Sequence, residues 1–538
     1  MLTRDPLKTP MLNITRRQFL TFVGAAGGSS ALLKTSLAMG LMPDEAYTGP
    51  VTVKPATQGS KPTVLILGAG IAGLATALEL ERAGFHCTIL EASHRAGGRN
   101  LTVRHGDKID EMGNTQICNF DKSENLYFNC GPARIPGHHR RLLHYCRALG
   151  VPLQIKANSC KLAYFHDDKA FGGKPVRQIE YHADVRGLMS ELVWKSASNN
   201  QYDQLMSEED VAKLTKFAQL HGDLTEAGKY IGTERAGSTM DRMLDFPKAH
   251  TPIELKTMLD SSFWHGGLLG AELYDWCEPL MEPTGGMDAV VKGFLGHLKN
   301  PPLLNAQVKK IYNREAGVEV SYEHQGKFHT VQADYCFNNI PAYFMAGIEN
   351  NFSTVYQAGL NSIKRGHLFK IAYQMKERFW EKEGIYGGIS YTADPIAQIW
   401  YPSHDIHAAK GILLGAYTWD PKASALFEAM TPAERLIEGA KSGEKIHPGF
   451  SKYIESGISI PWARMNHQMG CGLHMSPEDW EKYFAVLQQP EGRHFMIGDQ
   501  ISHHSGWQEG ALASSEQALQ QLNKLLALSG QREVSHVA

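Results

Sequence analysis

A glycine-rich segment near residue 70 has the spacing of a site that binds the phosphates of a dinucleotide. An apolar run at Thr63–Leu67 leads straight into Gly68-Ala69-Gly70-Ile71-Ala72-Gly73. In this motif the first glycine permits a tight turn, the second lets the backbone approach a pyrophosphate, and the third lets a helix pack closely on a strand. An acidic residue follows about 20 residues later, where it can accept hydrogen bonds from ribose hydroxyls. The candidate phosphate- and ribose-binding residues are Gly68, Gly70, Ile71, Ala72, Gly73 and Glu91.

A lysine interrupts an apolar alternating run, His367–Tyr373, that precedes Phe379-Trp380. The alternation predicts a strand, whose register decides whether Lys370 points inward or into solvent. Burying an ammonium without a partner costs free energy, so an inward Lys370 would need a reason to lie there.

The elements around the glycine motif follow the order strand, turn, helix, strand. A helical pattern runs through Leu80, and a second strand, His86–Leu90, ends directly before the acidic residue. Near the C-terminus, the strand Phe495–Asp499 leads into a helix that continues to about Leu528. A helix and strand after Asp288 and a strand at Ala333–Asn339 complete the pattern. The sequence predicts an α/β fold with a Rossmann-like domain assembled from discontinuous segments.

The segment after Glu91 resembles the flavin-containing amine oxidase family. Its Gly97-Gly98-Arg99 element favours FAD over NAD, and the resemblance implies that Arg99 lies along the flavin's pyrophosphate and ring system. Residues 495–499 and 505–511 resemble the closing FAD motif of the family, although the family usually has glutamate where Asp499 stands. A helix N-terminus aimed at the flavin would stabilise the negative charge of its reduced form.

The same resemblance implies FAD contacts from distant parts of the chain, among them a residue after position 305 whose backbone faces the adenine. The FAD-binding residues that it adds to the glycine motif are Ala92, Arg99, Gly131, Pro132, Ala133, Arg134, Val308, Asp499, Gly506, Trp507, Gln508 and Ala511.

Gly131-Pro132-Ala133-Arg134-Ile135-Pro136, followed by His139-Arg140, is similar to a motif of the L-amino acid oxidases within that family. The resemblance implies that Arg134 forms a salt bridge to the substrate carboxylate. A planar guanidinium suits this role, because two parallel hydrogen bonds fix the carboxylate and hence the direction of the α-hydrogen. The alternative is a surface arginine in a Gly-Pro loop.

Other residues are carried over from the family one by one. Tyr417 matches a second carboxylate ligand, and Trp507 and Trp462 match residues that line the substrate cavity, although either tryptophan could be ordinary core. Lys370 matches a lysine that holds a water beside the flavin and assists electron transfer to oxygen, so the resemblance makes it our candidate catalytic residue. Cys471 stands where some monoamine oxidases attach FAD covalently, but its flanking residues differ, so we expect non-covalent FAD.

These residues imply a reaction and leave rivals open. We expect oxidation of an L-amino acid by hydride transfer from its α-carbon to FAD, with molecular oxygen as second substrate, giving a 2-oxo acid, ammonia and hydrogen peroxide. The alternatives are an amino-acid monooxygenase that yields an amide, an amine or polyamine oxidase, and a flavin-fold binding protein without turnover. Large neutral or aromatic side chains are favoured, and basic ones stay open.

The composition excludes several classes of protein and site. The net charge of -2 over 538 residues gives no reason to expect nucleic acid or an anionic membrane as partner. Eight cysteines are spread over the chain without a C-x-x-C pair, so no metal site is expected on that basis. The oligomeric state stays open, a homo-oligomer included.

The N-terminal segment predicts export. Arg16-Arg17 precedes a short apolar, glycine-rich stretch, Val23–Leu33, which is typical of a twin-arginine signal and too short to span a membrane. We therefore expect the Tat export machinery as a partner and a periplasmic or extracellular location. The expected organisation is a signal at 1–40, a linker at 41–61, an FAD-binding domain at 62–130, 283–345 and 490–530, a substrate-binding domain with a mixed sheet at 131–184, 263–282 and 346–489, and a helical insert at 185–262.

Overall fold

The computed structural model describes residues 47, 49–55, 61–199, 206–239, 244–246, 248–263 and 273–537. The expected signal at 1–40 and most of the expected linker lie outside the described residues, so both stay predictions. Within the described part of the chain, no helix is long and apolar enough to cross a membrane.

A four-stranded parallel sheet forms the centre of the FAD-binding domain, in the order β2-β1-β17-β26. Its strands are β1 (Thr63–Leu67), β2 (His86–Leu90), β17 (Tyr335–Asn338) and β26 (His494–Met496). Four of the five residues of β1 are buried, as expected of a strand covered on both faces. The predicted α/β class with a Rossmann-like sheet from discontinuous segments is confirmed.

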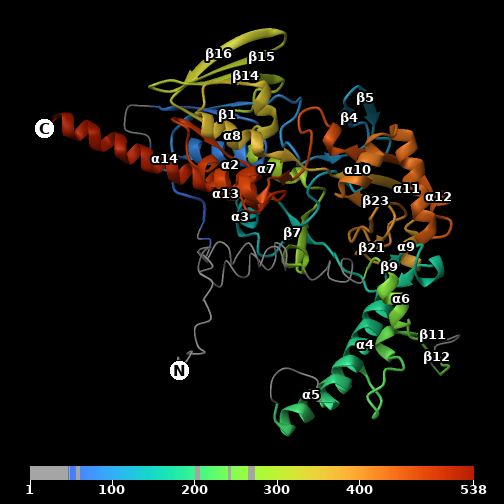
Figure 1. Ribbon diagram of the computed structural model, residues 1–538. Helices are drawn as coiled ribbons and strands as arrows, with labels where there is room; N and C mark the ends of the chain where they lie inside the picture. The colour runs from blue at the N-terminus through green and yellow to red at the C-terminus, as the bar shows by residue number, and fades with distance from the viewer. Residues whose placement is uncertain are drawn as a thin grey trace, which may run out of the picture.

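Helices from both ends of the chain cover one face of this sheet (Figure 1). They are α2 (Ile71–Arg82), α3 (Arg140–Ala148), α7 (Asp288–His297) and α14 (Gln508–Val537). The other face packs on the hairpin sheet β16-β15-β14-β18 and on two helices. These elements are β14 (Ala306–Asn313), β15 (Val318–His324), β16 (Lys327–Ala333), β18 (Glu349–Asn350), α8 (Thr354–Ser362) and α13 (Pro477–Leu487).

The substrate domain is built on a seven-stranded mixed sheet in the order β10-β9-β21-β22-β23-β20-β24. Its strands are β9 (Tyr164–His166), β10 (Val176–Arg177), β20 (Phe369–Met375), β21 (Ile389–Thr392), β22 (Gln398–Trp400), β23 (Gly411–Thr418) and β24 (Ile454–Pro461). Helices α10 (Pro421–Glu428), α11 (Pro432–Ile446) and α12 (Phe450–Tyr453) flank it, and aromatic side chains dominate the core between them. Every residue of β20 is buried.

A small three-stranded sheet connects the two domains beside the cavity described below. Strand β7 (Ile135–Pro136) pairs with β13 (Leu280–Pro283), which also pairs with β8 (Leu153–Ile155). The 3-10 turn η4 (Tyr274–Trp276) precedes β13 and is joined to it by residues 277–279. This pairing brings residues just before β7 and residues of η4 to the same place.

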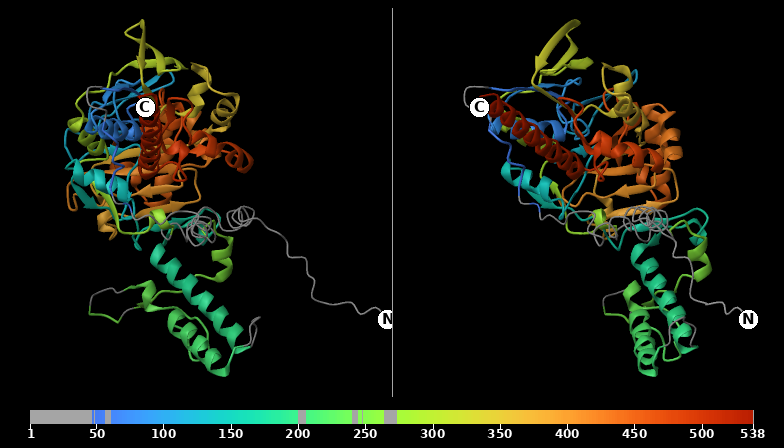
Figure 2. Two further views of the ribbon diagram at one scale, coloured as in Figure 1. Left: turned by 90° about the vertical axis from the view of Figure 1, so that its left-hand side faces the viewer. Right: turned by 60° about the vertical axis from the view of Figure 1, so that its left-hand side comes forward.

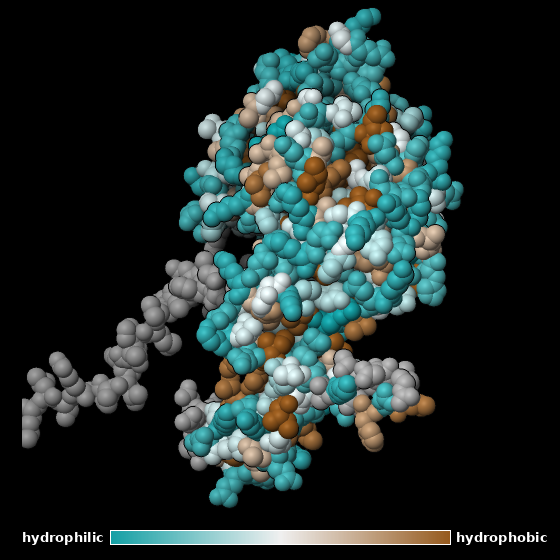
Figure 3. Space-filling view, turned by 90° about the vertical axis from the view of Figure 1, so that its right-hand side faces the viewer, coloured by the Kyte–Doolittle hydropathy of each residue, from teal (hydrophilic) through white to brown (hydrophobic). Residues whose placement is uncertain are grey.

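The insert consists mainly of α4 (Gln178–Ser198), α5 (Glu208–Gly222) and α6 (Leu255–Asp260), and it projects away from the two domains (Figure 2). Helix α4 begins at Gln178, before residue 185, where the insert was expected to start. Its first turns pack on the substrate domain, and the ring centroids of Tyr181 and Phe165 lie 5.0 Å apart. Apolar residues reach the surface of the insert (Figure 3), with Phe217 and Leu220 each 59% exposed.

The remaining short elements link these parts. They are β3 (Thr102–Val103), β4 (Lys108–Glu111), β5 (Asn114–Ile117), β6 (Phe128–Asn129), β11 (Ser238–Thr239), β12 (Lys248–Ala249), β19 (Lys364–Arg365), β25 (Leu473–His474) and α9 (Phe379–Lys382).

Candidate functional site

A cavity of about 720 Å³ lies between the FAD-binding domain and the substrate sheet. Nearly all of the residues singled out from the sequence line it, the two exceptions being Gly73 and Trp462. The residues on its wall are Gly68, Gly70, Ile71, Ala72, Glu91, Ala92, Arg99, Gly131, Pro132, Ala133, Arg134, Val308, Lys370, Tyr417, Asp499, Gly506, Trp507, Gln508 and Ala511. Segments more than 400 residues apart in the chain thus meet around one cavity.

The glycine turn presents bare backbone to this cavity. A Cβ at Gly73 would lie 2.2 Å from the carbonyl oxygen of Gly68, so the close approach of helix and turn requires glycine there. Helix α2 starts without a side-chain cap, at Gly70, and without an acidic residue in its first turn. The amides of its first turn therefore have no intrahelical acceptor and can bind an anion.

Glu91 binds the backbone of the glycine turn through its carboxylate. Its carboxylate accepts hydrogen bonds from the amides of Ala69 (2.7 Å) and Ser93 (2.8 Å). Burial raises the pKa of Glu91, and the two amides oppose that shift. The residue is therefore fixed at the end of β2, with oxygens on the cavity wall where an adenosine ribose would lie.

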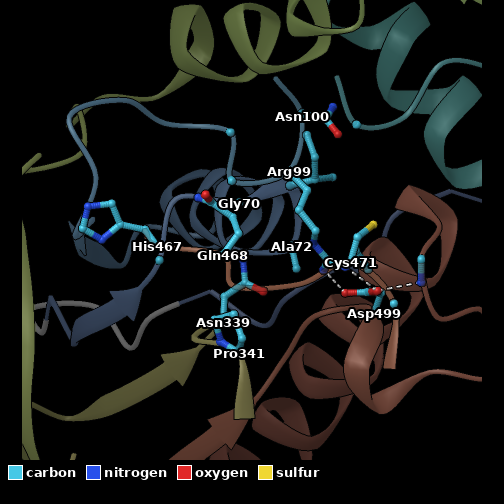
Figure 4. Close-up of a pocket in the computed structure, with 18 of the residues that line it drawn as sticks. Gly70, Ala72, Arg99, Asn100, Asn339, Pro341, His467, Gln468, Cys471 and Asp499 are labelled. Carbon is cyan, nitrogen blue, oxygen red and sulfur yellow. Dashed lines mark hydrogen bonds and ion pairs between the residues drawn. The ribbon is translucent and has the colours of Figure 1, made fainter. Parts of the chain in front are cut away.

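Arg99 and Asp499 form an ion pair across the cavity wall (Figure 4). The guanidinium donates two hydrogen bonds, one of 3.0 Å from Nη1 to Oδ2 and one from Nη2 to Oδ1. The amide of Gly506 also donates to Oδ2, at 2.7 Å. Burial disfavours the charge of Arg99, but the carboxylate outweighs burial and raises the pKa of the guanidinium. The shorter acid at position 499 is thus held by protein groups on both of its oxygens.

Cys471 lies beside this pair on the cavity wall (Figure 4). Burial raises the pKa of its thiol, while Arg99 acts in the opposite direction. A thiol that stays protonated at neutral pH is a weak nucleophile.

These features fit FAD. The chain offers uncapped helix amides for a pyrophosphate, an acid at the ribose position and a cavity that continues past Arg99 to the substrate sheet. The backbone is also tight at Gly131, where a Cβ would lie 1.9 Å from the carbonyl oxygen of Arg99. The residues that would hold the cofactor are those of the glycine turn, Glu91, Arg99, Val308 and the start of α14.

On the substrate side, Arg134 is buried in a cage of aromatic rings. Its guanidinium carbon lies 3.8 Å from the ring centroid of Trp276, 4.9 Å from that of Trp400 and 5.4 Å from that of Trp507. Arg134 directly precedes β7 in the chain and is only 6% exposed. The surface-loop alternative is therefore excluded.

The charge of Arg134 is not neutralised by a salt bridge in the described part of the chain, and its Nε has no hydrogen-bond partner there. Burial lowers the pKa of the guanidinium, and the negative forms of Tyr417, Tyr391 and Asp275 would oppose the shift. Stacking on aromatic faces stabilises the cation but leaves its N–H donors without acceptors. This arrangement is suited to a ligand that brings a carboxylate.

Lys370 lies inside, beside the cavity, and is 1% exposed. Its Nζ donates to the carbonyl oxygens of Gly131 (2.6 Å) and Asn129 (3.3 Å). The pairing of β20 with β23 sets Lys370 opposite Tyr417, and Nζ lies 4.6 Å from the centroid of that ring. Burial lowers the pKa of Lys370 to about 7, so it exchanges a proton readily near neutral pH.

The two predicted tryptophans differ in position. Trp507 lies on the cavity wall, and its ring packs edge-on against His139 at 5.0 Å. Trp462 lies behind the wall, fully buried, where its Nε1 donates to the carbonyl oxygen of Cys130 at 3.0 Å. It supports the segment that carries Gly131 instead of facing the cavity.

Sequence reasoning missed Trp276, Trp400 and Trp419, which line the substrate end of the cavity, and Asn339, which lies beside the glycine turn. Trp276 follows the insert and Trp400 lies in a short strand, so neither carried a motif. The signal available was the pair of aromatic residues at the end of β23, where Trp419 follows Tyr417 by two positions.

Comparison with known proteins shows the family to which this chain belongs. Residues 71–523 match the sequence model of the flavin containing amine oxidoreductases. An L-amino-acid oxidase of Siganus canaliculatus is 27% identical over 480 residues, covering 87% of this chain and 86% of the relative. The flavin-dependent L-tryptophan oxidase RebO of Lentzea aerocolonigenes is 26% identical over 490 residues, 84% of this chain and 96% of the relative. Among solved structures, cyclohexylamine oxidase from Brevibacterium oxydans IH-35A has a TM-score of 0.58 at 16% identity, over 87% of this chain and all of that one.

Proposed function

Because this chain belongs to the family of flavin-containing amine oxidoreductases and uses FAD, we propose that it oxidises an L-amino acid to a 2-oxo acid, ammonia and hydrogen peroxide. The observation that carries the proposal is Arg134, a buried cation that is stacked on tryptophan and lacks a salt bridge within the described residues. An amine without a carboxylate would leave this guanidinium without an anionic partner. The relatives named as L-amino-acid oxidases support the same substrate class.

The chain's residues act mainly by binding and orientation. Arg134 grips the substrate carboxylate, and the hydroxyl of Tyr417, whose pKa burial raises to about 12, stays protonated and donates a second hydrogen bond. Fixing the carboxylate turns the α-hydrogen toward the end of the cavity beyond Arg99. The aromatic wall excludes water, which strengthens these interactions.

FAD, when bound, accepts a hydride from the α-carbon and passes the electron pair to molecular oxygen. The neutral amine of the substrate expels that hydride, and water then hydrolyses the imine to the 2-oxo acid and ammonia. Lys370 is positioned to hold a proton at Nζ for the oxygen step, since its pKa of about 7 allows both protonation states at neutral pH.

The location of this reaction is part of the proposal. The Arg16-Arg17 motif and the apolar stretch behind it support export of the folded holoenzyme by the twin-arginine route. Replacing both arginines by lysine should retain active enzyme in the cytoplasm, as activity assays of cell fractions would show; unimpaired export would refute the assignment.

The central test is an anaerobic titration of the holoenzyme with each of the twenty common L-amino acids. Loss of the oxidised flavin's absorbance with an L-amino acid, but not with its decarboxylated amine, is the expected result. Product analysis in air should then find a 2-oxo acid and peroxide. An amide product would indicate a monooxygenase, bleaching by amines alone would indicate an amine oxidase, and absence of bleaching would refute turnover.

A further inference from the structure

Three histidines surround one carboxylate at the edge of the cavity, and none of the four has a role in the proposed reaction. The Oδ1 of Asp275, in turn η4, lies 2.7 Å from Nε2 of His138 and 3.3 Å from Nε2 of His139. The Nδ1 of His504 lies 3.8 Å from the other oxygen of the same carboxylate. The four residues come from three separate segments and converge on one point.

The donor atoms of this cluster lie close enough together to hold a metal ion. One ligand atom each from His138, His139 and Asp275 lies within 4.8 Å of the other two. The side chain of His139 is 1% exposed and that of Asp275 is 22% exposed, so the group is sheltered yet reachable by an ion. Imidazole nitrogens with one carboxylate oxygen form a donor set that Zn²⁺ and similar divalent ions prefer.

A second cluster of possible ligand residues differs from this one, because a lysine already neutralises its carboxylates. His166, Asp168 and Asp394 also lie within 4.8 Å of one another. There, however, Lys445 bridges both carboxylates, with Nζ 2.5 Å from Asp168 and 3.1 Å from Asp394. Among the described residues, no lysine or arginine forms a salt bridge with Asp275.

We propose that His138, His139 and Asp275 bind one divalent metal ion such as Zn²⁺. His504 or a water molecule would complete a tetrahedral site. A metal requires neutral imidazoles, so binding should weaken as pH falls.

The site is mechanically and electrostatically connected to Arg134. Trp276, which stacks on Arg134 at 3.8 Å, is the residue after Asp275, and His139 packs on Trp507. A bound ion would fix turn η4 against the segment of His138 and His139. It would also replace the negative charge of Asp275, which otherwise stabilises the Arg134 cation, by a net positive charge, and so leave Arg134 more dependent on the substrate carboxylate. This coupling rests on the proposed function, whereas metal binding does not.

The binding test uses FAD-loaded enzyme made without a polyhistidine tag and freed of metal with a chelator. Calorimetric titration with ZnCl₂ should show one ion per chain, and CoCl₂ should give the intense visible bands of a tetrahedral site. His138→Ala and Asp275→Asn remove a ligand and should weaken binding at least about 100-fold, since even neighbours of ligands matter 10- to 100-fold. The control His297→Ala removes an exposed histidine at the end of α7 and should bind as the parent does.

Equal FAD content and equal melting temperature of the variants would show that they fold. Failure of the parent enzyme to bind Zn²⁺ at micromolar concentrations would overturn the proposal, as would unchanged binding in the well-folded His138→Ala variant. In steady-state assays, Zn²⁺ should lower KM for the amino acid a few-fold in the parent and in His297→Ala, with no effect in Asp275→Asn. A KM that Zn²⁺ leaves unchanged would overturn the coupling to Arg134 even where calorimetry finds the ion bound.

Discussion

The two ends of the cavity treat charge in opposite ways. At the cofactor end, protein groups already neutralise or bind each of the charges that we described: Arg99 pairs with Asp499, and Glu91 accepts two amide hydrogen bonds. At the substrate end, Arg134 and Lys370 are both buried and rely on aromatic rings and carbonyl oxygens in place of carboxylates. Because an uncompensated buried charge is costly, the difference indicates which end requires a ligand that supplies a charge.

The contrast also explains why the two ends respond differently to mutation. Removing one member of a neutralised pair leaves a charge behind, so the cost falls on folding and cofactor binding. Removing a buried cation that has no protein counter-charge relieves the folded protein of a desolvation penalty, so the loss of free energy appears in substrate binding. The predictions below test this division.

Arg134→Ala should have the largest effect. Loss of a bidentate partner to a buried carboxylate costs on the order of 2–5 kcal/mol, so kcat/KM should fall by about 30-fold or more. Arg134→Lys should recover only part of this loss, because an ammonium lacks the planar fork. Steady-state kinetics with FAD content as the control decide the matter. Full activity of Arg134→Ala toward the same amino acids would end the proposal of a carboxylate site.

Lys370→Met should act on the oxygen half-reaction. Stopped-flow reoxidation of reduced enzyme should slow on the order of 100-fold, with reduction by substrate much less affected. In the parent, reoxidation should change with pH around 7, the pKa of Lys370, and this step should vanish in the variant. Equal losses in both half-reactions would indicate a structural lysine.

The same lysine should affect stability with a definite sign. Its folded pKa of about 7 lies below its usual value, so between pH 7 and about 10 the unfolded chain binds more protons than the folded one. Its burial penalty is complete below pH 7 and declines as pH rises through that window. The unfolding free energy of Lys370→Met relative to the parent, from urea titrations, should therefore be most favourable at pH 6 and less so at pH 9. A difference independent of pH would contradict the lowered pKa.

Asp499→Ala should break the cofactor end. It leaves Arg99 without its carboxylate and should destabilise the holoenzyme by about 2 kcal/mol, less than a fully buried pair would because the Arg99 side chain is 32% exposed. Thermal unfolding and FAD retention on gel filtration measure this. The double change Arg99→Ala with Asp499→Ala removes both charges and should restore part of the stability; no restoration would show that the two residues do not act as a pair.

Cys471→Ala should have the smallest effect. With its thiol pKa raised by burial, we expect no bond to the cofactor, so acid precipitation should release FAD from parent and variant alike. Flavin retained in the parent's pellet but not in the variant's would contradict non-covalent binding.

The features of this site that could be predicted from the sequence are those whose residues lie close together in the chain. The glycine turn and Glu91 were predictable because one short unit of strand, turn and helix contains both the motif and its reasons. The burial of Lys370 needed the register of β20, which the alternation alone left open. Trp276 could not be predicted, since it reaches Arg134 only through the pairing of β7 with β13, far apart in the chain.

The same reasoning applies to residues that were named correctly but without their partners. Arg99 and Asp499 each carried a motif, yet nothing local indicated that they bind each other across 400 residues. Trp462 carried the right resemblance, but its place behind Gly131 depends on how β24 ends against the segment of Cys130. Residue types can be inferred from motifs, whereas contacts across domains require the fold.

The pairing of Arg99 with Asp499 also determines when the cofactor cavity can form during translation. A chain emerging from the ribosome exposes the glycine turn and Arg99 first, but Asp499 and the first turn of α14 only about 400 residues later. Until then the central sheet also lacks β26, its edge strand. Such long-range closure is slow and leaves apolar surface uncovered in the meantime. The nascent chain therefore cannot complete its cofactor cavity before the start of α14 has been synthesised, so FAD would bind only after both domains have been made.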